Sequence, residues 1–215
     1  MTAIYIATPA YGPMDPRAAH SFAMAIADLV AAGHAVRWDI ELQDSNQARA
    51  RNVLLNRFLV SNFERLLCID ADMVFTSADI LELLNVGGDA VSGVYNQRAA
   101  GGTRVGTPLE FQIGDMHEMA RVGFGFLSVS RACIDKLSAA APRSFIAQTG
   151  ASAGVAVPEV VATDIAPDGS WLSVDWMFSD RWRSIGGDLW LHSAVNVGHV
   201  GSHLYTTTQG RPDVV

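Results

Sequence analysis

One short stretch most constrains how this chain can fold. Residues 66–69 (Leu-Leu-Cys-Ile) form an unbroken apolar run that leads directly into Asp70-Ala71-Asp72. Such a run is typical of a strand that is buried on both faces, as in a parallel sheet. The carboxylates then lie where the strand leaves the core, which in open α/β sheets is the edge where ligands bind. The stretch therefore predicts an α/β fold with a polar site at the end of this strand.

Two acids at this spacing point to a bound cation. Asp70 and Asp72 repel each other unless a cation or a shared proton lies between them. Mg²⁺ or Mn²⁺ suits oxygen ligands and usually bridges to substrate phosphates. The alternative is a turn whose acids are simply solvated, and an isolated Asp-x-Asp would favour it. The apolar run directly upstream shifts the interpretation towards a metal site.

The flanking segments support a layered α/β chain. A strand at 4–7, a helix opened by Asp15-Pro16 and a strand at 34–40 predict a parallel crossover. Further helices are expected after 44–47, after a capping box at 76–79, at 130–140 and after 173–175. Further strands are expected at 90–94, 123–129, 157–162, 189–191 and 195–199, whereas 96–121 shows little periodicity and is expected to be an irregular lid or binding loop.

Composition narrows the classes of function. The net charge is −7, which argues against nucleic acid as a partner. No apolar run approaches the roughly 18 residues of a membrane span. Cys68 and Cys133 are far apart in the chain and read as reduced core thiols, and the N-terminus lacks the basic region of a signal peptide. We expect a single domain over residues 1–215 and a cytoplasmic location; the sequence does not specify an oligomeric state.

The order of four motifs carries a resemblance to a known family. These motifs are residues 7–12 (Ala-Thr-Pro-Ala-Tyr-Gly), 50–52 (Ala-Arg-Asn), 70–72 (Asp-Ala-Asp), and 173–175 (Ser-Val-Asp) followed by 198–201 (Gly-His-Val-Gly). In this order and spacing the chain resembles the small GT-A glycosyltransferases, of the family 2-like and mannan-polymerase-like kind. The resemblance covers residues 3 to 205.

The resemblance implies a GT-A fold, Rossmann-like, with a mixed, mainly parallel sheet. A nucleotide-binding half would span about residues 1–95 and an acceptor and catalytic half about 96–205. The implied activity is metal-dependent transfer of a sugar from a UDP- or GDP-linked donor to a hydroxyl of a glycan or small-molecule acceptor. Asp70, Asp72 and His199 would hold Mn²⁺ or Mg²⁺, which neutralises the leaving nucleotide. For His199, a packed or surface histidine is the alternative.

The same resemblance implies a set of donor-binding residues. Arg51 would face the nucleotide or its phosphates, since its helix start already favours anions. Glu41, or Asp39 beside it, would accept hydrogen bonds from the base or ribose. The residues implied in nucleotide binding are Thr8, Pro9, Tyr11, Glu41, Arg51 and Asp70.

Asp175 matches the second position of the family's Glu-Asp pair. In inverting members this carboxylate takes the proton of the acceptor hydroxyl as a general base. The first position of the pair is Val174 here, so the match is partial and the inverting assignment is open. A helix N-cap is the alternative role of Asp175. Trp176 and Trp182 would either stack on sugar or belong to the core, and the glycines of 123–126 would let a ligand or another backbone approach closely.

Two other functions compete with glycosyl transfer. Apolar residues followed by Asp-x-Asp-x-Val also fit a haloacid-dehalogenase-type phosphatase, in which Asp70 would attack phosphorus and Asp72 would act as acid and base. Against this, two predicted strands precede the motif, and the later Gly-Asp-x-x-x-Asp metal pair is absent from the sequence. A non-catalytic nucleotide- or carbohydrate-binding module on the same fold is the second alternative, because a fold does not determine activity.

Overall fold

The computed structural model describes residues 2–98, 102–148, 152–201 and 204–205. Its helices are α1 (Pro16–Ala31), α2 (Gln47–Leu59), α3 (Ser77–Asn85), α4 (Arg131–Ala139) and α5 (Val174–Ser184). Its strands are β1 (Ala3–Ala10), β2 (Ala35–Leu42), β3 (Arg65–Ile69), β4 (Met73–Val74), β5 (Ala90–Val94), β6 (Thr107–Ile113), β7 (Met116–Arg121), β8 (Phe126–Ser130), β9 (Ser144–Ile146), β10 (Ala156–Pro158), β11 (Asp164–Ile165), β12 (Trp171–Leu172), β13 (Trp190–Asn196), β14 (Gly198–Val200) and β15 (Leu204–Tyr205).

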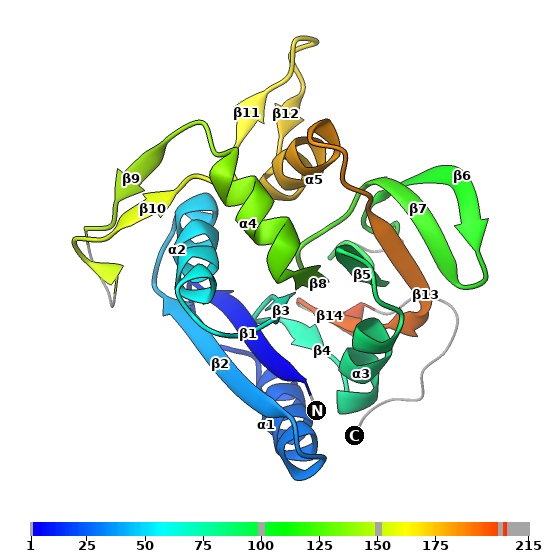
Figure 1. Cartoon of the computed structure of the whole chain (residues 1–215). Coiled ribbons are helices and arrows are strands. Elements are labelled where there is room, and N and C mark those ends of the chain that lie inside the picture. Colours follow the sequence, from blue (N-terminus) through cyan, green and yellow to red (C-terminus); the bar gives the residue numbers. More distant parts are fainter. Residues whose placement is uncertain (1, 99–101, 149–151, 202–203, 206–215) are drawn as a thin grey trace.

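The central sheet has the strand order β2-β1-β3-β8-β5-β13-β7-β6 (Figure 1). The pairs β1–β2, β1–β3 and β5–β13 are parallel, whereas β8 is antiparallel to both of its neighbours. β7 is antiparallel to β13 and to β6. All strands of this sheet except β8 and β7 therefore run in one direction, which confirms the mixed, mainly parallel sheet.

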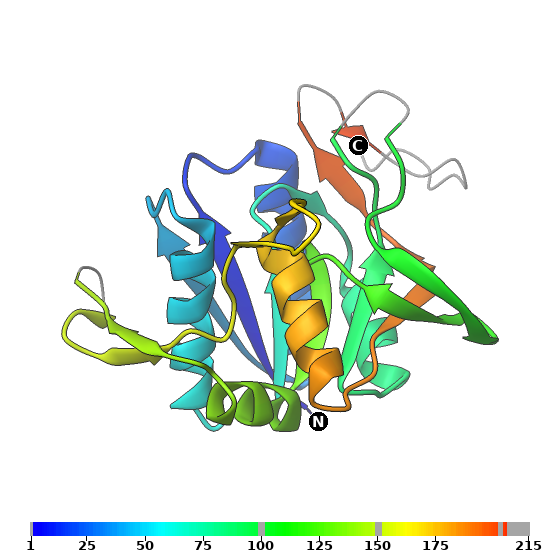
Figure 2. The same ribbon diagram turned by 90° about the horizontal axis from the view of Figure 1, so that it is seen from above.

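Helices cover both faces of the sheet. α2, α4 and α5 lie on one face and α1 and α3 on the other (Figure 2). Alternate residues of a strand point to opposite faces. In β1, Tyr5 and Ala7 join the cluster under α2, α4 and α5, whereas Ile4 and Ile6 join the cluster under α1 and α3. This two-sided burial is the physical reason that the central strands read as continuous apolar runs.

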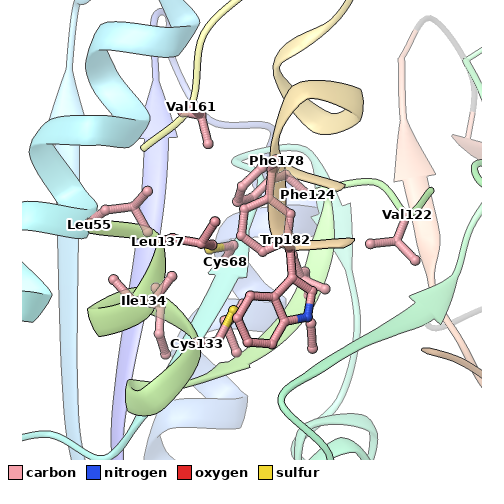
Figure 3. Packing of buried hydrophobic residues seen from close by; sticks show 14 of the residues in the cluster. Leu55, Cys68, Val122, Phe124, Cys133, Ile134, Leu137, Val161, Phe178 and Trp182 are labelled. Carbon is pink, nitrogen blue, oxygen red and sulfur yellow. The ribbon is translucent and has the colours of Figure 1, made fainter. Parts of the chain in front are cut away.

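The first of these clusters contains both cysteines. Cys68 of β3 and Cys133 of α4 are free thiols that pack with Phe124, Phe178 and Trp182 (Figure 3). Burial raises the pKa of the Cys68 thiol to about 12, so the thiol is unreactive at neutral pH. The expectation of buried, reduced core thiols is confirmed, and Trp182 is a core residue.

Helix starts follow the chemistry of the sequence. The Asp15 side chain accepts a hydrogen bond from the Arg17 amide, and Pro16 opens α1. Thr76 and Asp79 form the expected capping box of α3. Ser173 caps α5, so Asp175 lies in the first turn and is not the N-cap. That alternative for Asp175 was wrong because the shorter Ser173 side chain already accepts from the Trp176 amide.

In the described part of residues 96–121, from which 99–101 are excluded, the structure differs from the expectation of an irregular loop. These residues contain the hairpin β6–β7, which extends the central sheet at its edge. All of β6 is exposed, so no buried face imposes the alternation that sequence reading relies on. The closing strands also differ: β13 is one strand over Trp190–Asn196, and β14 pairs with β4 outside the central sheet. The strand expected at 157–162 is only Ala156–Pro158.

Candidate active site

A cleft of about 580 Å³ opens at the carboxyl ends of β1 and β3. It is lined by residues from five separate segments of the chain. The lining comprises Pro9, Ala10, Tyr11, Gly12, Pro13, Asp15, Asp44, Ser45, Gln47, Ala50, Asp70, Ala71, Asp72, Arg98, Val200 and Gly201. The cleft is therefore at the edge where the β3 motif predicted a polar site.

Backbone hydrogen bonds gather these segments around the Asp-x-Asp turn. The Asp70 amide donates to the Gly125 carbonyl (3.0 Å), which ties the turn to the start of β8. The Val200 amide donates to the Asp72 carbonyl (2.7 Å). β14 pairs with β4, so that His199 lies opposite Met73. A histidine more than a hundred residues later in the sequence is thereby brought beside Asp72.

We call Asp72, Arg98 and His199 the outer cluster. Arg98 Nη1 is 2.9 Å from Asp72 Oδ2, and His199 Nε2 is 3.4 Å from the same oxygen. Burial raises the pKa of Asp72, but the hydrogen bond with His199 and the charges of His199 and Arg98 outweigh it, so the pKa is lowered. Burial lowers the pKa of His199, but the contacts with Asp72 and the Asn96 carbonyl raise it overall.

The outer cluster fits a divalent cation through two protein ligands. His199 Nδ1 lies 2.9 Å from the Asn96 carbonyl oxygen and must donate to it, which leaves Nε2 facing Asp72 as the free lone pair when the ring is neutral. Metal-binding histidines are commonly oriented in this way. Within the described ranges, no group of three or more His, Cys, Asp or Glu side chains is placed to hold a metal. Mg²⁺ and Mn²⁺ sites of this kind complete their coordination with water and substrate phosphates.

We call Arg51, Asp70 and Asp175 the inner cluster. Arg51 is only 3% exposed, and its Nη2 donates to Asp70 Oδ1 (2.9 Å) and Oδ2 (3.1 Å). Its guanidinium also lies over the Phe124 ring, 4.6 Å from the centroid. The charges of Asp70 and Asp175 both favour the charged guanidinium. The structure thus places Arg51 beneath the cleft, bound to Asp70, and not among the residues that line it.

The Asp175 carboxyl has the pKa of a usable general base. Burial is the largest effect and raises the pKa, Arg51 lowers it, Asp70 raises it and a hydrogen bond from the Phe124 backbone lowers it. The result is a pKa of about 6, so the group is largely deprotonated at neutral pH. The preceding Val174 is buried in the core under α5. A carboxylate at position 174 would have to be buried there, which explains the apolar residue.

The structure brings only some of the predicted nucleotide-binding residues into the cleft. Pro9 and Tyr11 line it, and Tyr11 is 71% exposed. Thr8 is fully buried, and its hydroxyl accepts a hydrogen bond from Trp38 Nε1 (3.0 Å). Glu41 lies 2.6 Å from Arg57 Nη2 and faces a separate cavity between α2 and the β9–β10 hairpin. In this geometry neither the Thr8 nor the Glu41 side chain reaches the cleft.

Sequence reasoning missed Arg98 and Tyr95. Arg98 follows β5 in a stretch without clear periodicity, so no pattern marked it. Tyr95 is buried, and its hydroxyl accepts a hydrogen bond from the Gly125 amide (2.9 Å). A Cβ atom on Gly123 or Gly125 would collide with the Tyr95 ring or hydroxyl. The sequence signal for Tyr95 was the Gly-Phe-Gly pattern at 123–125. The space beside these glycines is filled by the Tyr95 side chain, and not by a ligand or another backbone as expected.

Comparison with known proteins places this site in a familiar fold. No family model and no curated protein sequence matches the chain. Among solved structures, A197 from STIV matches with a TM-score of 0.60 and 16% identity over 100% of this chain and 98% of that chain. GalNAc-T7, crystallised with UDP, GalNAc and Mn²⁺, matches with a TM-score of 0.58 and 11% identity over 93% of this chain.

The chain has a GT-A-like α/β fold. The match covers only 44% of the GalNAc-T7 chain, so the two proteins share a core and not their whole length. Identities this low establish the fold alone. The structural neighbours of this GT-A-like fold include glycosyltransferases. In the described part of the chain, no helix is both long and apolar enough to cross a membrane.

Proposed function

We propose that this protein is a metal-dependent glycosyltransferase that moves a sugar from a UDP- or GDP-linked donor to a hydroxyl acceptor. One observation carries the proposal: on a GT-A-like fold, Asp70 and Asp72 line the cleft, His199 pairs with Asp72, and Asp70 pairs with Arg51, whose charge also interacts with Asp175. The cleft volume of about 580 Å³ lies within the usual range for small-ligand sites. The crystallisation of GalNAc-T7 with UDP and Mn²⁺ supports the donor class.

The residues of the cleft have separate roles in this proposal. Pro9 and Tyr11 contact the nucleotide, and Asp72 with His199 holds Mn²⁺ or Mg²⁺. The bound cation supplies Lewis-acid stabilisation of the leaving nucleoside diphosphate. Asp70, which the sequence suggested as a metal ligand, belongs to the inner cluster but also lines the cleft with Asp72. Both of its oxygens accept hydrogen bonds from Arg51. Arg51 holds Asp70 in place, and its charge keeps the pKa of Asp175 lower than burial alone would set it.

Asp175 is the proposed general base of an inverting transfer. Its carboxylate would accept the proton of the acceptor hydroxyl as that oxygen attacks the sugar. The position at the start of α5 favours the ionised carboxylate through the helix dipole, although burial still dominates its pKa. The proposal needs no acid at position 174, because Asp175 alone provides the base.

Calorimetric titration of UDP and of GDP, each with and without Mn²⁺, tests this function. We expect one nucleotide to bind only with the metal, and Asp72→Ala to abolish that binding without a change in fold by circular dichroism. Asp115→Ala is a matched control, since Asp115 lies in the β6–β7 turn away from the cleft. Full transfer activity in Asp72→Ala, or no nucleotide binding by the folded protein, would refute the proposal.

The phosphatase alternative requires a free nucleophile at Asp70. Both oxygens of Asp70 instead accept from Arg51, which makes them poor nucleophiles, and the fold is GT-A-like. The binding-module alternative is decided by activity: metal-dependent hydrolysis or transfer of a nucleotide sugar that is lost in Asp72→Ala distinguishes an enzyme from a binder. The cytoplasmic location and the two-half organisation at about residues 95–96 stay predictions.

A further inference from the structure

We propose that Arg98 competes with the divalent cation for Asp72 and, once the cation displaces it, binds the donor diphosphate. This inference rests on the function proposed above and adds a residue that no sequence pattern indicated. It assigns one side chain two alternating partners, a carboxylate and a phosphate, both of which suit the guanidinium.

The competition follows from a shared atom. Arg98 Nη1 contacts Asp72 Oδ2 at 2.9 Å, and His199 Nε2 faces the same oxygen at 3.4 Å. A cation held by this oxygen and this nitrogen would be close to the guanidinium, because Arg98 contacts the same oxygen. Two positive charges so close repel strongly in a partly buried site. Binding of the metal therefore weakens the Arg98–Asp72 pair, and Arg98 in turn lowers the affinity of the metal.

The charge of the cleft explains why a displaced Arg98 would bind phosphate. Asp15, Asp44, Asp70 and Asp72 all line the cleft, and Arg98 is the only Lys or Arg among its described lining residues. Arg17 and Arg49 neutralise Asp15 and Asp44 from outside it. A diphosphate that enters such a cleft needs positive charge from the metal and from Arg98. The Arg98 side chain is 54% exposed, so its guanidinium can turn without unfolding a core.

The segment that carries Arg98 also orients the metal ligand. The Asn96 carbonyl holds His199 Nδ1, and the Tyr95 ring meets the His199 ring edge-on, with centroids 5.7 Å apart. A β-bridge between Asn96 and Arg104 fixes the backbone at Asn96, two residues before Arg98. One short segment thus supplies both the carbonyl that orients His199 and the Arg98 guanidinium that the metal displaces.

Calorimetry with Mn²⁺ alone tests the competition. We expect Arg98→Gln to bind Mn²⁺ about threefold more tightly than wild type, the effect of removing one partly exposed ion pair. Arg104→Gln is the matched control, because it removes the same charge from the same segment but does not line the cleft. Equal Mn²⁺ affinities in Arg98→Gln and Arg104→Gln, or no Mn²⁺ binding in any of the proteins, would overturn the inference.

A second titration tests the phosphate role. At saturating Mn²⁺ we expect UDP, or GDP if that is the donor nucleotide, to bind about tenfold more weakly to Arg98→Gln, since a charge-assisted hydrogen bond is lost. The Mg²⁺ complex of pyrophosphate should show the same loss. Unchanged affinity for both ligands would refute the phosphate role. If pyrophosphate binding depends on Arg98 while neither nucleotide binds, the proposed donor fails and the assignment of Arg98 stands.

Discussion

The two carboxylates of the Asp-x-Asp motif are only two residues apart, yet they belong to different environments. Asp70, in the inner cluster, is held by Arg51, which is only 3% exposed. Asp72, in the outer cluster, contacts a half-exposed arginine and a mostly buried histidine of β14. The comparison indicates that the Arg51–Asp70 pair of the inner cluster is a permanent electrostatic support for Asp175, whereas the partners of the outer cluster can be exchanged for a metal and a substrate.

The largest expected effect is on the chemistry of the inner cluster. Asp175→Asn should lower kcat by about 10³-fold, because the amide cannot accept the acceptor proton. Its affinity for UDP and Mn²⁺ should stay within twofold of wild type, as measured by calorimetry. A parallel loss of nucleotide affinity would show that Asp175 belongs with the outer cluster after all.

Stability should separate the two arginines. Arg51→Met leaves Asp70 and Asp175 facing each other without their cation, and we expect a loss of about 3 kcal/mol in the free energy of unfolding. Arg98→Met should change it by less than about 0.5 kcal/mol, because its ion pair is half exposed. Urea denaturation of both variants measures the difference. Equal effects would contradict the division into a support and an exchangeable pair.

The pH dependence of the transfer rate reports on Asp175 of the inner cluster. The pKa of Asp175 is about 6, and a general base acts only when it is deprotonated. The transfer rate should therefore be constant above pH 7 and fall through pH 6, to about a tenth of the plateau at pH 5. The residual rate of Asp175→Asn should lack this acid limb; if it persists there, another group titrates.

The smallest effect concerns Thr8, which the sequence placed at the nucleotide. Thr8→Val removes the acceptor for Trp38 Nε1, so the unfolding free energy should fall by about 1 kcal/mol. UDP affinity should be unchanged within twofold, because the Thr8 side chain is buried. UDP affinity should be compared with that of Pro9→Ala, because Pro9 does line the cleft. A marked loss of UDP binding in Thr8→Val would instead support the original assignment.

Local signals predicted much of the fold. Asp15, the capping box at Thr76 and the apolar run of β3 each produced the expected helix or strand, because the controlling interactions lie within a few residues. The hairpin β6–β7 was missed for the opposite reason: strand pairing holds it, and β6 has no buried face. The glycines of 123–125 were recognised as unusual, but the tyrosine that requires them, Tyr95, comes from the segment directly after β5.

The sequence by itself determined that Asp70 and Asp72 would emerge at the end of a buried strand, since apolar continuity and chain order are local properties. It could not decide that Asp70 turns to a buried arginine while Asp72 faces a histidine and an arginine from distant segments. Those partners are brought together by the pairing of β14 with β4 and by the packing of α2 on the sheet. Tertiary structure made this decision because charge–charge interactions depend on distances that chain spacing does not specify.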